Sequence, residues 1–284
     1  MRNILLCFFA ALLLSARTAA ARDYSVKDYK IVADGTTLNT TALQNLINKV
    51  SEKGGGRIVF PAGKYLTGQL NLKSNVELHL CKDAYILGST SPFDYLTLET
   101  KNTDGDARKD NAHLGLIVSN GAKNIAITGT GTIDGQGLAL ALHADSLHHS
   151  GIYIDKNYNV RRQRPSELVR PTLFYLYQVE GLVIDSVHLK NSANWGVSLN
   201  QCKQARLTNL NIYNRAYWNN DGIDITDCKN VLIEKCNVNS ADDGICLKSY
   251  DATTCNDSII IRDCEVRSSA SAIKFGTGSY GGFR

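Results

Sequence analysis

A repeat of short apolar strands in the second half of the chain constrains the fold most strongly. Four consecutive segments share one pattern and align on the apolar residues Ile184, Leu207, Ile233 and Ile261. Each aligned segment is followed by a second short strand. Repeat periods of about 20 to 50 residues are typical of solenoid proteins, in which every repeat stacks on its neighbours. The pattern therefore predicts an all-β fold, a single-stranded right-handed parallel β-helix with one coil per repeat.

The first half of the chain fits the same architecture, with a helix near its beginning. Asn39 or Thr40 precedes apolar residues at helical spacing, namely Leu43, Leu46, Ile47 and Val50, and either could cap that helix. Short strands are expected at 57–60, 65–66, 76–80 and 85–88, and a further strand-and-turn unit at 124–135. One early helix followed by many short strands predicts a solenoid with a short N-terminal capping helix.

Two long polar stretches, 91–115 and 136–170, interrupt this pattern. Irregular stretches of this length are usually functional loops or poorly ordered segments. We predict loops for both. The histidines His143, His148 and His149 are then expected to be solvated loop residues and not metal ligands.

The first residues resemble a targeting segment. A basic start, an apolar run over 4–14 and three alanines at 19–21 form the pattern of a cleaved signal peptide. The apolar run is too short for a membrane-spanning helix, and an uncleaved anchor is the alternative. We predict a signal peptide at 1–21, a β-helix domain at 22–284, and a secreted or periplasmic location.

Composition narrows the class of partner. Hydrophobic residues at 43% and charged residues at 20% favour an ordinary globular protein. The formal net charge of +4 suits an acidic partner, but dense Lys/Arg clusters typical of nucleic-acid binders are absent from the sequence. We expect a monomer that binds an acidic polysaccharide or oligosaccharide and no nucleic acid.

The cysteines follow the repeat. Cys236 and Cys264 occupy equivalent positions in successive repeats, as do Cys202 and Cys228, whereas Cys255 is one position out of register. Disulfides are possible in an exported protein. Columns of this kind favour stacked buried thiols, and the absence of paired Cys-x-x-Cys motifs argues against a zinc site.

Acidic residues gather where two repeats meet. Alignment of the second strands places Trp195, Asp221, Asp243 and Ser271 in one column, with Asp242 beside it. Since paired strands lie about 4.8 Å apart, these carboxylates should repel one another and raise at least one pKa. Such an arrangement is costly for stability alone, which favours a catalytic role. Two carboxyl groups of different pKa are what glycoside hydrolysis requires.

Strand geometry raises one difficulty for this cluster. Strict alternation would point the side chains of Asp242 and Asp243 to opposite faces of the strand. Gly222 and Gly244 follow the acidic residues, and a bend or bulge at these glycines could bring the carboxylates together.

At these residues the chain resembles family 28 glycoside hydrolases, the pectin-degrading polygalacturonase and rhamnogalacturonan hydrolase group. The family's Asn-x-Asp motif corresponds to Asn219-Asn220-Asp221, and its Asp-Asp pair to Asp242-Asp243. The similarity extends from Asp34-Gly35 through Phe60-Pro61-Ala62-Gly63 to the end of the chain. It implies that Asp242 is the general acid and that Asp221 and Asp243 activate water in an inverting mechanism, without a metal or organic cofactor.

Two departures from the family pattern concern the substrate site. Ser271 lies where the family's Gly-His-Gly motif has histidine, and the family's Arg-x-Lys motif would lie about one coil beyond Arg284. We therefore interpret the chain as truncated at its C-terminal end. The expected substrate-binding residues are Asn219 and Ser271, together with Lys248 and Lys274, which could meet a uronate carboxylate or could be ordinary solvated lysines.

The sequence thus predicts an exported inverting hydrolase of galacturonate-containing pectic polysaccharide or oligosaccharide. Endo or exo action, and polygalacturonan or rhamnogalacturonan as substrate, remain open. A calcium-dependent β-helix polysaccharide lyase is one alternative. A non-catalytic glycan-binding or adhesive β-helix is the other.

Overall fold

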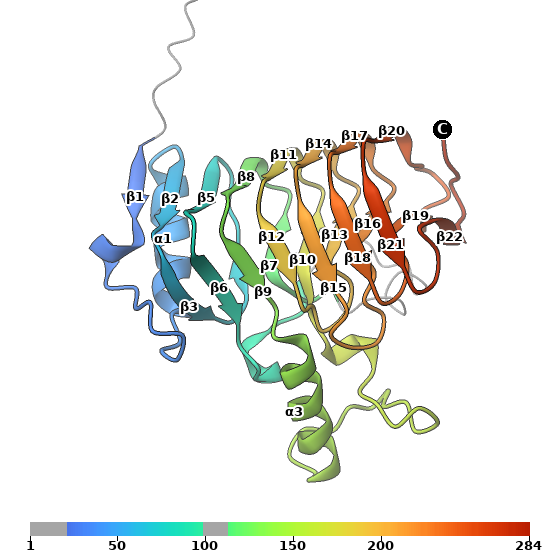
Figure 1. Ribbon diagram of the computed structural model, residues 1–284, viewed down its shortest axis with the longest axis horizontal. Helices are drawn as coiled ribbons and strands as arrows, with labels where there is room; N and C mark the ends of the chain where they lie inside the picture. The colour runs from blue at the N-terminus through green and yellow to red at the C-terminus, as the bar shows by residue number, and fades with distance from the viewer. Residues whose placement is uncertain (1–21, 99–112) are drawn as a thin grey trace, which may run out of the picture.

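The computed structural model describes residues 22–98 and 113–284. They form one parallel β-helix, in which successive coils stack on one another (Figure 1). Sheet A contains β1 (Asp23–Ser25), β2 (Gly56–Phe60), β5 (Val76–Leu80), β8 (Lys123–Gly129), β11 (Glu180–Asp185), β14 (Lys203–Thr208), β17 (Lys229–Glu234) and β20 (Asp257–Arg262). Sheet B contains β3 (Gly63–Thr67), β6 (Ala84–Gly88), β9 (Thr132–Asp134), β12 (His188–Lys190), β15 (Asn211–Asn214), β18 (Asn237–Ser240) and β21 (Glu265–Ser268). Sheet C contains β4 (Leu70–Asn71), β7 (Gly115–Asn120), β10 (Thr172–Tyr177), β13 (Val197–Asn200), β16 (Ile223–Thr226), β19 (Ile245–Ser249) and β22 (Ile273–Ser279).

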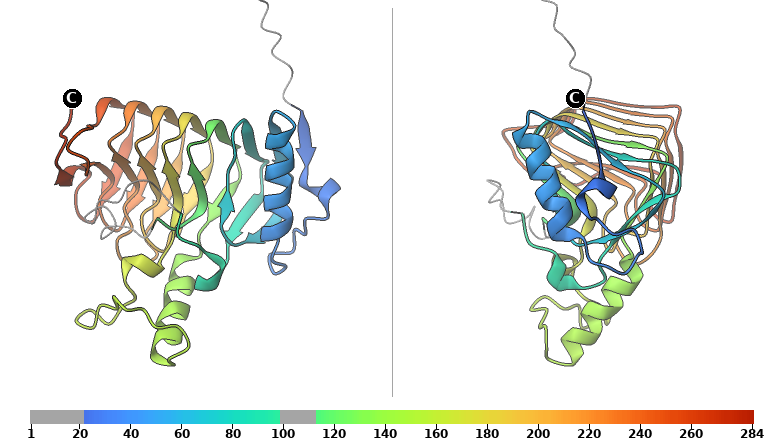
Figure 2. Two further views of the ribbon diagram at one scale, coloured as in Figure 1. Left: turned by 180° about the vertical axis from the view of Figure 1, so that it is seen from behind. Right: turned by 90° about the vertical axis from the view of Figure 1, so that its left-hand side faces the viewer.

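From β2 onward each coil contributes one strand to each sheet, and the predicted register is confirmed. Ile184 pairs with Leu207, Leu207 with Ile233, and Ile233 with Ile261, all in parallel. The view along the coil in Figure 2 shows the three sheets enclosing one interior. Apolar residues at alternate strand positions fill that interior, because every second side chain of a strand points to the same face. The expected all-β solenoid is therefore confirmed.

The helix α1 (Thr40–Glu52) packs at the N-terminal end of the coil (Figure 2). Its predicted apolar face is confirmed, because Leu43, Leu46, Ile47 and Val50 are all buried in the common core. Asn39 holds the N-cap position but makes no side-chain capping bond. Its amide oxygen instead accepts a hydrogen bond from the backbone N–H of Val32, at 2.8 Å. Burial of an amphipathic face therefore stabilises this helix more than capping does.

The predicted loop 136–170 is wrong in its first part. Residues Gly137–His149 form the helix α3, which projects from the coil (Figures 1 and 2). Its buried residues are Gly137, Leu140, Ala141 and Ala144, at helical spacing. This signal was weak because small residues form most of the buried face while leucines such as Leu142 point to solvent.

The described parts of the two polar stretches are otherwise mainly irregular. Short 3-10 turns occur at Pro92–Asp94 and Glu167–Val169, and a further one precedes α1 at Val26–Tyr29. The predicted histidine positions therefore lie on α3 instead of a loop. His149 also faces Asp145 one helical turn away, at 3.7 Å. Residues 99–112 and the predicted signal peptide at 1–21 lie outside the described residues.

The seven cysteines of the described residues are free thiols, and the predicted stacking is confirmed. The backbone N–H of Cys202 donates to Sγ of Cys228 at 3.3 Å, and that of Cys228 donates to Oδ1 of Asn256 at 2.9 Å. Asn256 thus continues the column, which explains why Cys255 is out of register.

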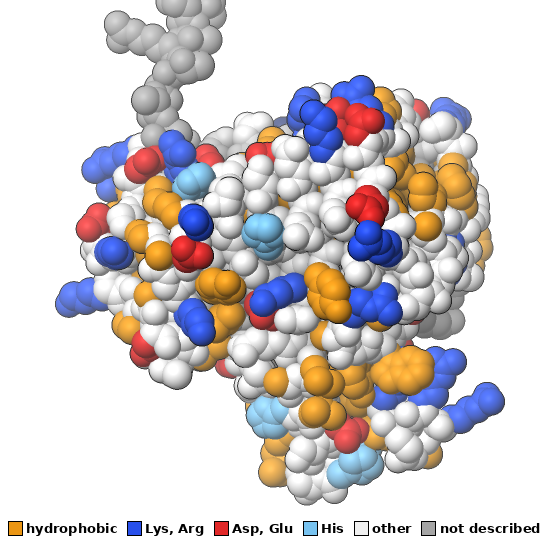
Figure 3. Space-filling view, in the orientation of Figure 1, with side chains coloured by type: hydrophobic (Ala, Val, Ile, Leu, Met, Phe, Trp, Pro, Cys, Tyr) orange, Lys and Arg blue, Asp and Glu red, His pale blue; other side chains and the backbone are white. Residues whose placement is uncertain are grey.

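The surface carries both signs of charge. On the face drawn in Figure 3, basic and acidic side chains are interspersed. Among the described helices, none is long and apolar enough to cross a bilayer.

The assigned register can be tested with two adjacent residues of β11, Ile184 and Val183. Ile184 is fully buried, whereas 37% of the neighbouring Val183 is exposed. We expect Ile184→Ala to lower the free energy of unfolding by about 2 to 5 kcal/mol, because it leaves a cavity in the coil interior. Val183→Ala should change it by less than about 1 kcal/mol. Urea denaturation of both variants measures the difference, and equal losses would contradict the assigned register.

Candidate active site

The predicted acidic residues line a groove of about 280 Å³ on the outside of the coil. Its lining residues come from neighbouring coils and from the segment before β10: Glu167, Trp195, Asn219, Asp221, Asp242, Asp243, Lys248, Lys274 and Thr277. Six of the seven residues expected from the sequence therefore meet in one place. Ser271, the seventh, contributes through its backbone, and Glu167 and Thr277 were not predicted.

Backbone pairing between coils brings the three aspartates together. The N–H of Gly222 donates to the carbonyl of Asp243 at 2.9 Å, and the N–H of Gly244 donates to that of Ser271 at 2.8 Å. One carboxylate oxygen from each of Asp221, Asp242 and Asp243 lies within 4.8 Å of the other two. The predicted column of Trp195, Asp221, Asp243 and Ser271 is thus confirmed, since the following residues pair in the same register.

The two glycines resolve the difficulty of strand alternation. Asp242 and Asp243 precede the first residue of β19 and lie in a bend, so the alternation of a regular strand does not apply to them. A Cβ on Gly222 would come within 2.5 Å of the carbonyl oxygen of Gly244. A Cβ on Gly244 would come within 2.6 Å of the carbonyl oxygen of Ala272. Glycine therefore permits the close coil-to-coil approach at the bend.

The aspartates differ in exposure and in partners. Asp221 and Asp243 are each 3% exposed, whereas Asp242 is half-buried. Nζ of Lys274 lies 2.7 Å from Oδ2 of Asp243, and this hydrogen bond raises the pKa of Lys274. The backbone N–H of Ser271 donates to Oδ1 of Asp243 at 3.2 Å. The side chain of Asp243 is therefore held in place between a cation and a backbone donor.

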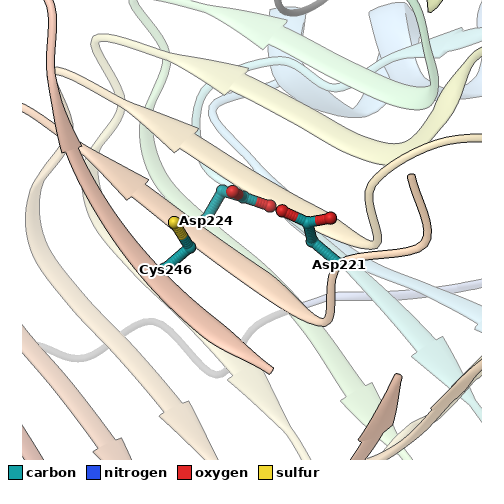
Figure 4. A group of neighbouring side chains, drawn as sticks. All are labelled: Asp221, Asp224 and Cys246. Carbon is teal, nitrogen blue, oxygen red and sulfur yellow. The ribbon is translucent and has the colours of Figure 1, made fainter. Parts of the chain in front are cut away.

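A fourth acid, Asp224, belongs to the site although we did not expect it. It is fully buried on β16, and its carboxylate faces that of Asp221 (Figure 4). Burial raises the pKa of Asp224 to about 7. Burial and then the nearby Asp224 also raise the pKa of Asp221 well above its ordinary value. An acidic residue between Ile223 and Ile225 was the available signal, but in a strand that pattern usually means a solvent-facing side chain.

Lys248 is placed inside this acidic group instead of in solvent. It is 4% exposed, and its Nζ lies 3.6 Å from Oδ1 of Asp224 and 4.7 Å from the ring centre of Trp195. Burial lowers the pKa of Lys248, but the carboxylates of Asp224 and Asp221 outweigh that effect and raise it. The reading of Lys248 as an ordinary solvated lysine is therefore wrong. Lys274, with 36% of its side chain exposed, is the more accessible cation.

A buried arginine that we did not single out holds the Asn-x-Asp turn in place. Arg170 is 0% exposed, and its Nη2 donates to Oδ1 of Asn219 at 2.9 Å. Its Nη1 donates to the carbonyls of Trp218 and Ala193, at 2.8 and 2.6 Å. Burial lowers the pKa of Arg170 to about 10, so it remains a cation at neutral pH. Asn219 has a φ of 58°, and the arginine fixes this left-handed turn.

The middle residue of the same turn is structural. Asn220 is 0% exposed, and its Nδ2 donates to the carbonyls of Ser192 and Asn194, at 2.9 and 2.8 Å. Its Oδ1 accepts from the backbone N–H of Tyr217 at 2.5 Å. These bonds tie the turn to the preceding coil, so the carboxylate of Asp221 is presented from a rigid support.

A cation is another group that clustered carboxylates of this kind bind. The oxygens of Asp221, Asp242 and Asp243 have the spacing of a ligand set, and oxygen ligands suit Ca²⁺ or Mg²⁺. The ammonium groups of Lys248 and Lys274 lie within the same groove and would oppose a divalent ion. The charge balance therefore favours acid–base chemistry by the side chains themselves.

Comparison with known proteins supports the family indicated by the site. Residues 52–267 match the sequence model of glycosyl hydrolases family 28. The chain is 30% identical over 246 residues to a probable polygalacturonase of Vitis vinifera, covering 84% of this chain and 47% of that protein. It is 28% identical over 256 residues to an exo-poly-alpha-D-galacturonosidase of Dickeya chrysanthemi, covering 80% and 42%. The chain belongs to glycosyl hydrolase family 28.

A solved structure agrees with this assignment. The chain is similar to the hyperthermoactive exopolygalacturonase of Thermotoga maritima, with 26% identity, a TM-score of 0.76, and coverage of 93% of this chain and 64% of that one. The chain spans about half the length of the curated relatives named above.

The arginine clamp gives a test of how the site is supported. We expect Arg170→Lys to lower the free energy of unfolding by roughly 2 to 4 kcal/mol, because one ammonium group cannot satisfy the carbonyl and amide acceptors that the guanidinium bonds. Arg161→Lys, at an exposed position of the same segment, is the matched control and should be neutral. Chemical denaturation compares the two, and a neutral Arg170→Lys would contradict the clamp.

Proposed function

We propose that the chain is a glycoside hydrolase that cleaves galacturonate-containing pectic polysaccharide or oligosaccharide. The observation that carries this proposal is the meeting of three carboxylates within 4.8 Å of one another in a surface groove. The family membership supports the reaction class, and the names of the relatives support the uronide substrate.

The three acids divide the work according to their surroundings. Asp242, the most accessible of them, is the general acid that protonates the leaving oxygen and recovers its proton from solvent. Asp221 and Asp243 bind and deprotonate the attacking water. Lys274 supports this division, because its hydrogen bond holds the side chain of Asp243 in place near Asp221.

The accessible cation also suits the substrate. Lys274 lies at the groove with part of its side chain exposed, and it can reach a uronate carboxylate. Asn219 lines the same groove, and its amide can bond a sugar hydroxyl while Arg170 holds its oxygen. Ser271 supports the site by orienting Asp243 through its backbone N–H.

The stereochemical outcome that we propose is inversion, in which water attacks the sugar from the face opposite the leaving group. Acid and base are commonly about 6.5 to 9.5 Å apart in inverting enzymes. The closest oxygens here are nearer than that, so inversion is proposed from the family membership and not from this spacing. We also infer export through residues 1–21 and action as a monomer.

Removal of the general acid tests the proposal. Asp242→Asn should lower the release of reducing ends from polygalacturonate by about 10² to 10⁴-fold, the usual contribution of a general acid, and leave the thermal unfolding curve unchanged. Asp263→Asn, at an exposed position in a left-handed turn that asparagine tolerates, is the matched control and should retain full activity.

The product identifies the outcomes that would overturn the proposal. An ultraviolet-absorbing unsaturated uronide in place of a saturated one would indicate a lyase. Binding of polygalacturonate without release of reducing ends would indicate a glycan-binding β-helix. Near-normal activity of Asp242→Asn would remove the assigned acid.

A further inference from the structure

Two carboxylates and one ammonium group are buried together at the groove, which Asp221 and Lys248 line. Asp224 and Asp221 are 0% and 3% exposed, and Lys248 is 4% exposed. Figure 4 shows the carboxylates of Asp221 and Asp224 turned toward each other, with Cys246 on the neighbouring strand. Among the described residues, neither oxygen of Asp224 accepts a hydrogen bond. The ammonium group of Lys248, 3.6 Å away, is its nearest cation.

A buried carboxylate at position 224 lowers the stability of β16, which could carry a neutral residue there instead. The two residues that pair directly with Asp224, Ser198 on β13 and Cys246 on β19, are both uncharged. A buried carboxylate without hydrogen bonds loses several kcal/mol of solvation. Neutral side chains at the directly paired positions show that stacking of the coils does not require an acid here.

More acidic than basic side chains surround the pair. The titratable groups facing it from the packed elements are Asp242 and Asp243 in the bend before β19, the neutral thiol of Cys246 and Lys248 on β19, Lys274 on β22, and Glu167 from the segment before β10. Lys274 already pairs with Asp243 at 2.7 Å. The Asp221–Asp224 pair is therefore left with one buried cation, and two buried carboxylates with one cation favour the retention of one proton.

We propose that Asp224 and Lys248 are positioning residues that set the proton occupancy of Asp221 in opposite directions. The proposal rests on the role given above to Asp221 as a water-activating base. Asp224 repels a negative charge on Asp221 and so favours the protonated pair. Lys248 attracts that charge and favours the ionised pair.

The proton balance of the reaction defines the consequence. The pair must be fully ionised before turnover, because Asp221 takes a proton from water as the new carbon–oxygen bond forms. Asp242 gives its proton to the leaving oxygen as the glycosidic bond breaks. Asp221 then loses its proton to solvent and Asp242 regains one. The fall of kcat at acidic pH, the acid limb of the profile, therefore has its midpoint at the pKa for loss of the last proton from the Asp221–Asp224 pair.

Two substitutions should move that limb in opposite directions. Asp224→Asn removes a negative charge beside Asp221, which lowers the pKa of Asp221 and shifts the acid limb to lower pH by about one to three units. Lys248→Met removes the positive charge and should shift the limb to higher pH. Lys248→Arg keeps the charge and should restore the wild-type limb. Ser198→Ala changes the neutral neighbour of Asp224 and should leave the limb in place.

The measurement is kcat against pH for these variants, with reducing-end release from polygalacturonate as the readout. Shifts of opposite sign support the proposal. Acid limbs that stay in place, or that move in the same direction in both variants, overturn it. This holds even if kcat falls, because a loss of kcat without a shift of the limb indicates a packing role. If Lys248→Met does not fold, the near-isosteric Asp224→Asn decides the sign by itself.

Folding stability supplies a second readout that needs no turnover. The pKa of Asp224 is raised to about 7 in the folded chain, above its unfolded value of 3.8. A group with a raised folded pKa contributes stability that is present below the unfolded pKa and is lost as the pH rises through the folded one. The melting temperature of wild type should therefore fall relative to Asp224→Asn between about pH 4 and pH 7.

The two readouts separate the two proposals. If the wild type releases no reducing ends, the proposed function fails. If the wild type is active and the limbs do not shift, the positioning role fails alone. A melting-temperature difference between wild type and Asp224→Asn that is independent of pH would also overturn the charge coupling.

Discussion

Parallel backbone pairing between successive coils is the constraint on which the site depends. The coils can approach closely at the bends only because Gly222 and Gly244 carry no side chain there. The hydrogen bonds of these glycines to the next coil place Asp221 and Asp243 one strand spacing apart, and the bend turns Asp242 toward them. A shift of register by one residue would separate the carboxylates and point the apolar strand residues outward.

The electrostatic repulsion among the clustered carboxylates is offset by cations and hydrogen-bond donors from neighbouring elements. Lys274 and the backbone of Ser271 hold Asp243, Lys248 approaches Asp224, and Arg170 fixes the turn that carries Asp221. These contacts come from two neighbouring coils and from the segment before β10. The same coil stacking that creates the repulsion therefore also supplies the charges that oppose it, and that balance gives each carboxyl group a different environment.

The sequence predicted those features that repeat, and it missed those that depend on one packing environment. The pairing of Ile184 with Leu207 and the column of Asp221 and Asp243 follow from periodicity, because every coil obeys one geometry. The helix α3 was missed because glycine and alanine form most of its buried face. Asp224 was missed because alternation normally places such a residue in solvent, and burial on the outer side of sheet C comes only from the tertiary structure. Arg170 was missed because its partners are mostly backbone carbonyls.

The anomeric configuration of the first product tests the central claim most directly. Proton NMR of polygalacturonate during early turnover distinguishes new reducing ends before they mutarotate. Water held by Asp221 and Asp243, with Asp242 as the acid, predicts that new reducing ends appear first in the configuration opposite to that of the cleaved bond. Products that first appear with the original configuration would show a covalent glycosyl-enzyme route and would contradict the roles given to the three aspartates.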